Sequence, residues 1–96
     1  MTPEVKVKKK AVAQLKALRA YHFYPVTGGY GRSGVPDIIV CLQGRFIGIE
    51  CKAGANKTTK LQDLNLRQIT DAGGLALVID ESNVDQLTEI LEKATP

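Results

Sequence analysis

The chain has 96 residues, of which 44% are hydrophobic and 24% are charged, and its formal net charge is +3 at pH 7. A sequence of this length and composition predicts one folded domain with a single core. No apolar run approaches the ~20 residues that a membrane-spanning helix needs. The charged N-terminus also lacks the apolar stretch of a signal peptide. We therefore expect no membrane partner and a cytoplasmic location.

Positive charge is concentrated in the first 60 residues. This part holds 11 Lys or Arg against 3 acids and carries +8, whereas residues 61–96 hold 2 against 7 and carry −5. A basic region beside an acidic one suggests a polyanionic partner. Two ordinary solvated surfaces would give the same pattern, so the charge alone does not decide between these two interpretations.

The two cysteines, Cys41 and Cys51, form neither a metal motif nor a predicted disulfide. They lie on one predicted hairpin with their side chains on opposite faces, so they cannot bridge each other. No CxxC pair is present, and the single histidine, His22, is remote in sequence. A zinc site is therefore not expected, and we interpret both cysteines as small buried hydrophobic residues.

The first predicted element is a helix that runs to about residue 19. Thr2 is a hydroxyl N-cap, and Pro3 occupies the first helical position. The apolar stripe of the helix contains Ala11, Leu15 and Leu18, flanked by Val5 and Val12. Continued towards the N-terminus, the stripe passes through Lys8 and Glu4, so we expect Glu4 on the inward side of the helix.

A hairpin is the next strong signal along the chain. Residues 21–26 predict a short strand that Pro25 restricts to an edge of the sheet, and residues 27–34 predict a loop. Residues 37–42 are almost continuously apolar, as in a strand buried on both faces. Gln43-Gly44 is a turn, and residues 45–52 return as the partner strand.

The last third of the chain predicts a helix, a strand and a helix. Thr59 and Gln62 have the spacing of a capping box, and the helix that they open ends at Gly73-Gly74. Residues 75–79 predict a buried strand. We expect Ser82 to cap a final amphipathic helix, whose apolar face contains Val84, Leu87 and Leu91. The order is α-β-β-β-α-β-α, an α/β fold with a mixed sheet flanked by helices.

The register of the hairpin brings charged residues together. With a two-residue turn, the numbers of paired residues sum to 87, so Asp37 lies opposite Glu50 with Cβ atoms ~5 Å apart. Lys52 shares the face of Glu50 because side chains alternate along a strand. Like charges in direct opposition destabilise a sheet. A proton or a cation must therefore lie between the two carboxylates.

Two interpretations of this cluster remain. Lys52 can supply the positive charge, which gives a purely structural group of two acids and a lysine. Alternatively, the carboxylates hold Mg²⁺ or Mn²⁺, which prefer hard oxygen ligands, and the lysine acts on water or phosphate. The second arrangement is suited to metal-assisted hydrolysis of a phosphodiester, and we favour it.

The same residues resemble a known superfamily of nucleases. Pro36-Asp37 followed by Glu50-Cys51-Lys52 resembles the PD-(D/E)xK motif, and "GVPDIIV…IGIECKAG" with a downstream glutamine resembles its VRR-NUC (virus-type replication-repair nuclease) branch. The resemblance implies a compact restriction-endonuclease-like core and a single VRR-NUC-like domain over residues 1–96. It also implies that Asp37, Glu50 and the main-chain carbonyl of Cys51 bind the metal, while Lys52 positions the attacking water.

The resemblance gives two further positions a role. VRR-NUC proteins carry a glutamate in the first helix and a glutamine in the helix after the lysine strand, which here are Glu4 and Gln62. Glu4 is then an additional metal ligand and Gln62 a catalytic residue. The alternatives are that Gln62 serves only the capping box and that Glu4 is a favourable acid at a helix N-terminus.

Several basic and aromatic residues are candidates for DNA contact. Lys6, Lys9 and Lys10 face away from the core stripe of the first helix and suit phosphate contacts. Tyr30 and Arg32 lie in the loop over residues 27–34, which either contacts DNA at the mouth of the site or is only a flexible connector. Residues 29–34 of this loop match G-x-G-x-x-G. A dinucleotide site requires that motif to open a helix, whereas here it leads into a strand. No nucleotide cofactor is therefore expected.

Together these features predict an Mg²⁺- or Mn²⁺-dependent DNA endonuclease of bacterial or phage-infected cells. The resemblance to phage-type members implies branched DNA as substrate, with Holliday junctions as the best single hypothesis. Cutting both strands of a symmetric junction requires two active sites, so we expect a homodimer. The alternatives are a flap- or end-processing nuclease with the same fold, and a DNA-binding module without catalytic activity.

Overall fold

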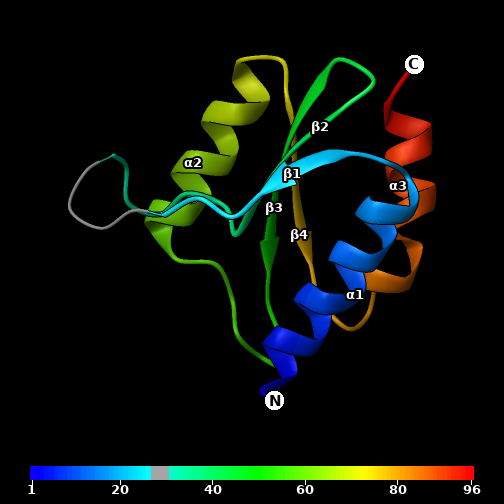
Figure 1. The fold of residues 1–96 in the computed structure, drawn as a ribbon. Helices are drawn as coiled ribbons and strands as arrows, with labels where there is room; N and C mark the ends of the chain where they lie inside the picture. The colour runs from blue at the N-terminus through cyan, green and yellow to red at the C-terminus, as the bar shows by residue number, and fades with distance from the viewer. Residues whose placement is uncertain (27–30) are drawn as a thin grey trace.

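The computed structural model describes residues 1–26 and 31–96 (Figure 1). Its elements are α1 (Pro3–Ala17), β1 (Tyr21–Phe23), β2 (Ile38–Leu42), β3 (Arg45–Cys51), α2 (Lys60–Asp71), β4 (Leu75–Ile79), the 3₁₀ helix η1 (Val84–Gln86) and α3 (Leu87–Ala94). This order is the predicted one, with η1 added before the last helix. No helix in the described ranges is long and apolar enough to cross a membrane.

The four strands form one mixed sheet in the order β1-β2-β3-β4. The pairs β1–β2 and β2–β3 are antiparallel, and β3–β4 is parallel. A parallel pair needs a crossover connection, which α2 provides. In Figure 1, α2 lies on one side of the sheet, and α1 and α3 lie together on the other.

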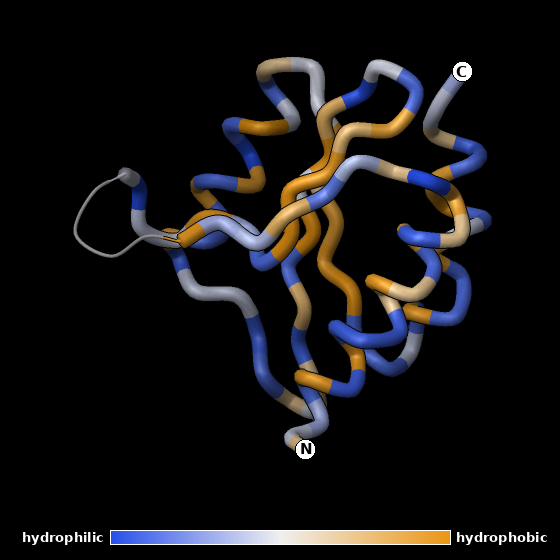
Figure 2. Tube along the Cα trace, in the orientation of Figure 1, coloured by the Kyte–Doolittle hydropathy of each residue, from blue (hydrophilic) through white to orange (hydrophobic). Residues whose placement is uncertain are grey.

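The core fills the space between the sheet and the pair α1–α3. Its fully buried large side chains come from alternate positions of the strands and from one face of each helix, and Figure 2 shows these apolar segments in the middle of the molecule. They include Leu15, Ile38, Ile47, Ile49, Ile79, Leu87 and Leu91. Gln14 on α1 ties the two helices together, because its side chain donates to the Val84 carbonyl and accepts from the Thr88 amide.

The inward stripe of α1 differs from the predicted one by a small rotation. Val7, Ala11 and Leu15 are buried, whereas Val5 is 41% exposed and Leu18 is only partly buried. Val5 and Val7 lie about 200° apart around the helix, so only one of them can face the core, and it is Val7. Glu4 precedes Val7 by three residues and therefore lies on the same side of the helix, where it lines a small cavity with Asp37. Lys8 lies at the edge of the stripe and is partly buried.

The hairpin has the predicted turn and register. Gln43 and Gly44 have φ values of 52° and 78°, which is typical of the type I′ turn that matches strand twist. The pairs Ile38–Ile49 and Leu42–Arg45 both sum to 87. The prediction that sets Asp37 beside Glu50 is therefore confirmed at the level of backbone register.

Two strands are less buried than the sequence predicts. In β2 the side chains of Ile38, Val40 and Leu42 are buried, but Cys41 is exposed. In β4 only Ile79 is fully buried, and Val78 is 42% exposed. For β2 the cause is the position of α2, which packs on β3 and β4 and leaves the same face of β1 and β2 uncovered.

Ser82 does not cap the last helix as predicted. Its hydroxyl donates to Asp80 Oδ1 at 2.5 Å, and Asn83 Oδ1 accepts the Asp80 amide at 2.8 Å. These contacts close a tight turn after β4, and η1 begins without a side-chain cap. The predicted apolar face of the C-terminal segment is confirmed, because Val84, Leu87 and Leu91 are buried.

Candidate active site

The candidate site lies where β3 ends and β2 begins. Asp37 precedes β2 directly, and its Oδ2 accepts a hydrogen bond from the Cys51 amide at 2.8 Å. The next amide, that of Lys52, donates to the Ile79 carbonyl of β4 at 2.9 Å. The end of β3 is therefore fixed from both sides, and the carboxylate of Asp37 is held against it.

Glu50 is a buried carboxylate on the α2 side of the sheet. It is 3% exposed, and its Oε2 accepts from Gln62 Nε2 at 3.0 Å and lies 3.4 Å from Lys52 Nζ. Its Oε1 is buried and has no hydrogen-bond partner among the described residues. Because a buried charged oxygen is costly to leave unpaired, this atom marks a place for a proton or a cation.

The electrostatics of Glu50 lead to the same conclusion. The pKa of Glu50 is raised from 4.5 to about 7. Burial is the largest cause and the negative charge of Asp37 the second, whereas Lys52 acts in the opposite direction. At neutral pH the folded protein therefore holds a partly protonated carboxyl group beside a second carboxylate. A bound cation would replace that proton.

Gln62 makes both contacts that the sequence left as alternatives. Its Oε1 accepts the Thr59 amide at 2.9 Å, and the Thr59 hydroxyl accepts the Gln62 amide at 3.2 Å, so the capping box is complete. The same side chain donates to Glu50 from Nε2. The first turn of α2 is thus connected directly to the buried carboxylate.

Only the main chain of Cys51 is available to the site. Its thiol is unsuited to metal binding. The side chain is fully buried, and burial, followed by the charge of Asp37, raises the pKa of the thiol to about 12. The amide of Cys51 points towards Asp37. In a strand the carbonyl of a residue points to the same side as its amide, so the Cys51 carbonyl faces the side of Asp37.

Glu4 lies close to Asp37 without completing a ligand cluster. Glu4, Val5, Lys8 and Asp37 line a small cavity of about 40 Å³ at the start of α1. Within residues 1–26 and 31–96, no three His, Cys, Asp or Glu side chains come together as a metal-binding group. The acidic groups that interact are the carboxylates of Asp37 and Glu50.

Comparison with solved structures identifies this fold. A chain described as a VRR_NUC domain superposes with a TM-score of 0.67 and 29% sequence identity, over 93% of this chain and 97% of that one. The chain has the fold of a VRR-NUC domain. The resemblance inferred from the Asp37 and Glu50-Cys51-Lys52 motifs is therefore confirmed. No family model and no curated protein sequence matches the chain.

In this VRR-NUC fold, the residues predicted to contact DNA are dispersed. Lys6, Lys9 and Lys10 are exposed on α1, and Lys10 Nζ lies 3.9 Å from Asp85. Arg32 donates a hydrogen bond to the side chain of Gln68 on α2. Among the described residues, no hydrogen bond or ion pair joins these four side chains to Asp37 or Glu50. The fifth, Tyr30, lies outside the described residues.

Two residues near the candidate site were not assigned a role from sequence. Lys8 lines the small cavity with Asp37. Its i, i+4 spacing from Glu4 was the feature of the sequence that could have indicated this position. Asn65 is 5% exposed and donates to the Ser33 and Leu61 carbonyls at 3.0 and 2.9 Å. It thereby fixes the segment that leads into Asp37 against α2.

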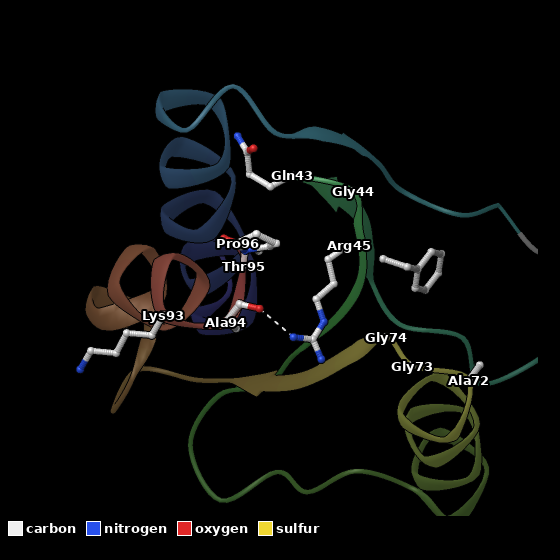
Figure 3. Close-up of a pocket in the computed structure, with 11 residues that line it drawn as sticks. Gln43, Gly44, Arg45, Ala72, Gly73, Gly74, Lys93, Ala94, Thr95 and Pro96 are labelled. Carbon is white, nitrogen blue, oxygen red and sulfur yellow. Dashed lines mark hydrogen bonds between the residues drawn. The ribbon is translucent and has the colours of Figure 1, made fainter.

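A larger cavity at the opposite end of the sheet is not the site. It has a volume of about 660 Å³ and lies where β3 begins, between the hairpin turn and the C-terminal ends of α2 and α3 (Figure 3). Arg45 crosses it and donates to the Ala94 carbonyl at 2.7 Å. None of the described residues that line it is acidic, so it offers no carboxylate to a cation.

Proposed function

We propose that this protein is a metal-dependent DNA endonuclease. The observation that carries the proposal is the buried, partnerless Oε1 of Glu50 beside the Asp37 carboxylate. The similarity to a VRR_NUC domain supports a nuclease of the PD-(D/E)xK type. The metal requirement and the nature of the DNA are inferences from the chemistry of the site.

The donors at the end of β3 fit Mg²⁺ or Mn²⁺. Asp37 and Glu50 supply carboxylate oxygens and Cys51 supplies a carbonyl oxygen, which are the hard ligands that these ions prefer. Water would complete the coordination, since Mg²⁺ usually keeps several waters. When bound, such an ion would polarise the phosphate and increase the acidity of a coordinated water.

The other side chains of the site have separate tasks in this proposal. The Lys52 ammonium, held 3.4 Å from Glu50 Oε2, orients the attacking water and balances the negative charge that develops on the phosphate. Gln62 holds Glu50 Oε2 and so leaves Oε1 directed at the cation. Glu4 faces Asp37 across the small cavity and assists as a metal ligand through water.

We propose branched DNA as the substrate, with the Holliday junction as the first candidate. No segment of this chain resembles a base-reading module, so recognition rests on DNA shape. One chain supplies one catalytic cluster, and paired cuts in a symmetric junction require two. A homodimer follows from that requirement. The alternative, a flap- or end-processing nuclease, would use the same chemistry with a single catalytic cluster.

The competing proposal is a DNA-binding module without activity. The presence of Asp37, Glu50, Lys52 and Gln62 in one contact network favours catalysis, since a binding module has no need for a buried carboxylate that lacks a partner.

The test is cleavage of a DNA panel in Mg²⁺ or Mn²⁺ by the wild type and by Asp37→Asn. The panel contains a four-way junction, a flap, a splayed arm, a linear duplex and a single strand. Symmetric paired cuts in the junction that disappear in the variant support junction resolution. Cleavage of flaps or ends alone keeps the nuclease and rejects the junction. Binding without any metal-dependent cleavage supports the non-catalytic module.

A further inference from the structure

A second groove runs along α1, on the side of the helix next to Tyr24. Its volume is about 530 Å³, and its floor contains the apolar side chains of Val5, Val12 and Ala13. Its other lining residues are three lysines, Lys8, Lys9 and Lys16, and the aromatic ring of Tyr24. It therefore combines an apolar floor with positive charge.

The groove adjoins the small cavity beside Asp37. Its residues on α1 follow a spacing of three and four, which places them on one stripe of the helix. The stripe extends from Val5 to Lys16, about 16 Å at the rise of an α-helix. Val5 and Lys8 line both this groove and the small cavity that contains Glu4 and Asp37. A ligand in the groove would thus extend towards the cavity that Glu4 and Asp37 line.

The positive charge of the groove is not neutralised by the protein. Among the described residues, Lys8, Lys9 and Lys16 form no salt bridge, whereas Lys10 on the neighbouring stripe lies near Asp85. Lys8 Nζ lies 5.2 Å from the centre of the Tyr24 ring, and Tyr24 remains 49% exposed. A partly exposed aromatic ring beside the ammonium groups of Lys9 and Lys16 suits a ligand that has both flat bases and phosphates.

We infer that this groove binds a single-stranded segment of the DNA substrate next to the cleaved phosphodiester, with a base stacked on Tyr24 and phosphates on Lys9 and Lys16. The inference rests on the proposed nuclease function and, among the proposed substrates, favours those with unpaired bases beside the cut, such as a flap, a splayed arm or a junction opened at its branch point. In a double helix the bases are stacked on one another, so the Tyr24 ring finds no free base face on which to stack. Unpaired bases, by contrast, stack on aromatic side chains whatever their sequence.

The test is binding of a fluorescein-labelled single strand and of its duplex, measured by fluorescence anisotropy in EDTA so that cleavage cannot occur. The variants are Tyr24→Ala, Tyr24→Phe and the double variant Lys9→Ala/Lys16→Ala. The matched control is Arg67→Ala, which removes an exposed charge from α2 on the other side of the sheet. Thermal melting checks that each variant is folded.

We expect Tyr24→Ala to weaken single-strand binding about tenfold, and Tyr24→Phe to retain it, because stacking requires the ring and not the hydroxyl. The lysine double variant should reduce the dependence of log K on log salt by about 1.4 for the single strand. Arg67→Ala should leave both values unchanged.

Equal binding of the single strand by wild type and Tyr24→Ala would overturn the inference. A loss of duplex and single-strand binding to the same extent in the lysine variant, with no effect at Tyr24, would instead assign the groove to duplex backbone. Because binding is measured without metal, the result does not depend on whether the proposed nuclease function is correct. If the wild type shows Tyr24-dependent binding but no cleavage in Mn²⁺, only the nuclease is rejected.

Discussion

Gln62 donates a hydrogen bond to Glu50 Oε2 at 3.0 Å while its own side-chain oxygen accepts the Thr59 amide at 2.9 Å. One amide group therefore fixes the start of α2 and orients the buried carboxylate. The position of the helix and the geometry of the candidate site are linked by this single side chain.

Substitution of Gln62 should separate capping from positioning. We expect Gln62→Ala to lower the free energy of unfolding by about 1–3 kcal/mol, because it removes a reciprocal cap and a partner of a buried carboxylate. Metal-dependent cleavage should fall with it. Urea denaturation and a cleavage assay measure the two effects.

Thr59→Ala is the matched control for that variant. It removes the other half of the capping box but leaves the contact of Gln62 with Glu50 in place. Stability should fall by about 1 kcal/mol, whereas cleavage should stay near the wild-type rate. If the two variants lose activity equally, the contact between Gln62 and Glu50 has no separate role in the site.

Without divalent ions, stability should decrease as the pH rises through neutrality. The pKa of Glu50 is raised from 4.5 to about 7 in the folded protein, so between these values the folded state binds more protons than the unfolded state. The free energy of unfolding therefore falls as the pH increases from about 5 to 8. Glu50→Gln should remove this decrease, and Glu92→Gln, at an exposed position on α3, should not. The same slope in wild type and Glu50→Gln would contradict the assignment.

Mn²⁺ should stabilise the protein, and more at pH 8 than at pH 6. Binding requires deprotonated carboxylates, and the raised pKa of Glu50 makes the proton compete at the lower pH. At a concentration 100 times the dissociation constant, stabilisation is about 2.7 kcal/mol, which corresponds to a rise in Tm on the order of 10 °C. Asp37→Asn should lose most of this rise. A purely structural group of two acids and a lysine predicts no rise in the wild type.

Gly48 should tolerate no side chain, because α2 packs closely on β3 at this point. An added Cβ would lie 2.7 Å from Ile69 Cδ1 and 2.9 Å from Pro36 Cγ. We expect Gly48→Ala to destabilise the fold by about 1–3 kcal/mol. Combined with Ile69→Val, which removes the Cδ1 atom, it should cost less than the sum of the two single changes. Strict additivity in urea denaturation would show that the two residues do not meet.

Local rules predicted the parts of this fold that depend on neighbouring residues. The Gln43-Gly44 turn sets the hairpin register, and the register sets Asp37 beside Glu50, so the central pair could be predicted from a short stretch of sequence. The capping box of Thr59 and Gln62 is local in the same way. The second contact of Gln62, with Glu50, is a tertiary one, and the capping pattern alone did not decide it.

Burial could not be predicted where it depends on which helix covers which part of the sheet. Cys41 has an apolar neighbourhood in sequence, yet α2 covers β3 and β4 and leaves it exposed. Ser82 has the residue type of an N-cap, but the adjacent Asp80 takes its hydroxyl. Likewise, the groove along α1 requires Tyr24 to fold back beside Lys8, which no spacing along the chain indicates.

The most direct test of the account is cleavage of a labelled four-way junction in Mn²⁺ under single-turnover conditions, by wild type and by Lys52→Ala. The control is Lys57→Ala, because Lys57 is an exposed lysine in the segment that follows the site. We predict that the wild type cleaves, that EDTA abolishes cleavage, that Lys52→Ala is slower by at least about 100-fold, and that Lys57→Ala is close to the wild type. Two results would contradict the proposed catalytic cluster. One is metal-dependent cleavage by Lys52→Ala at the wild-type rate. The other is that the wild type shows no metal-dependent cleavage of any DNA tested.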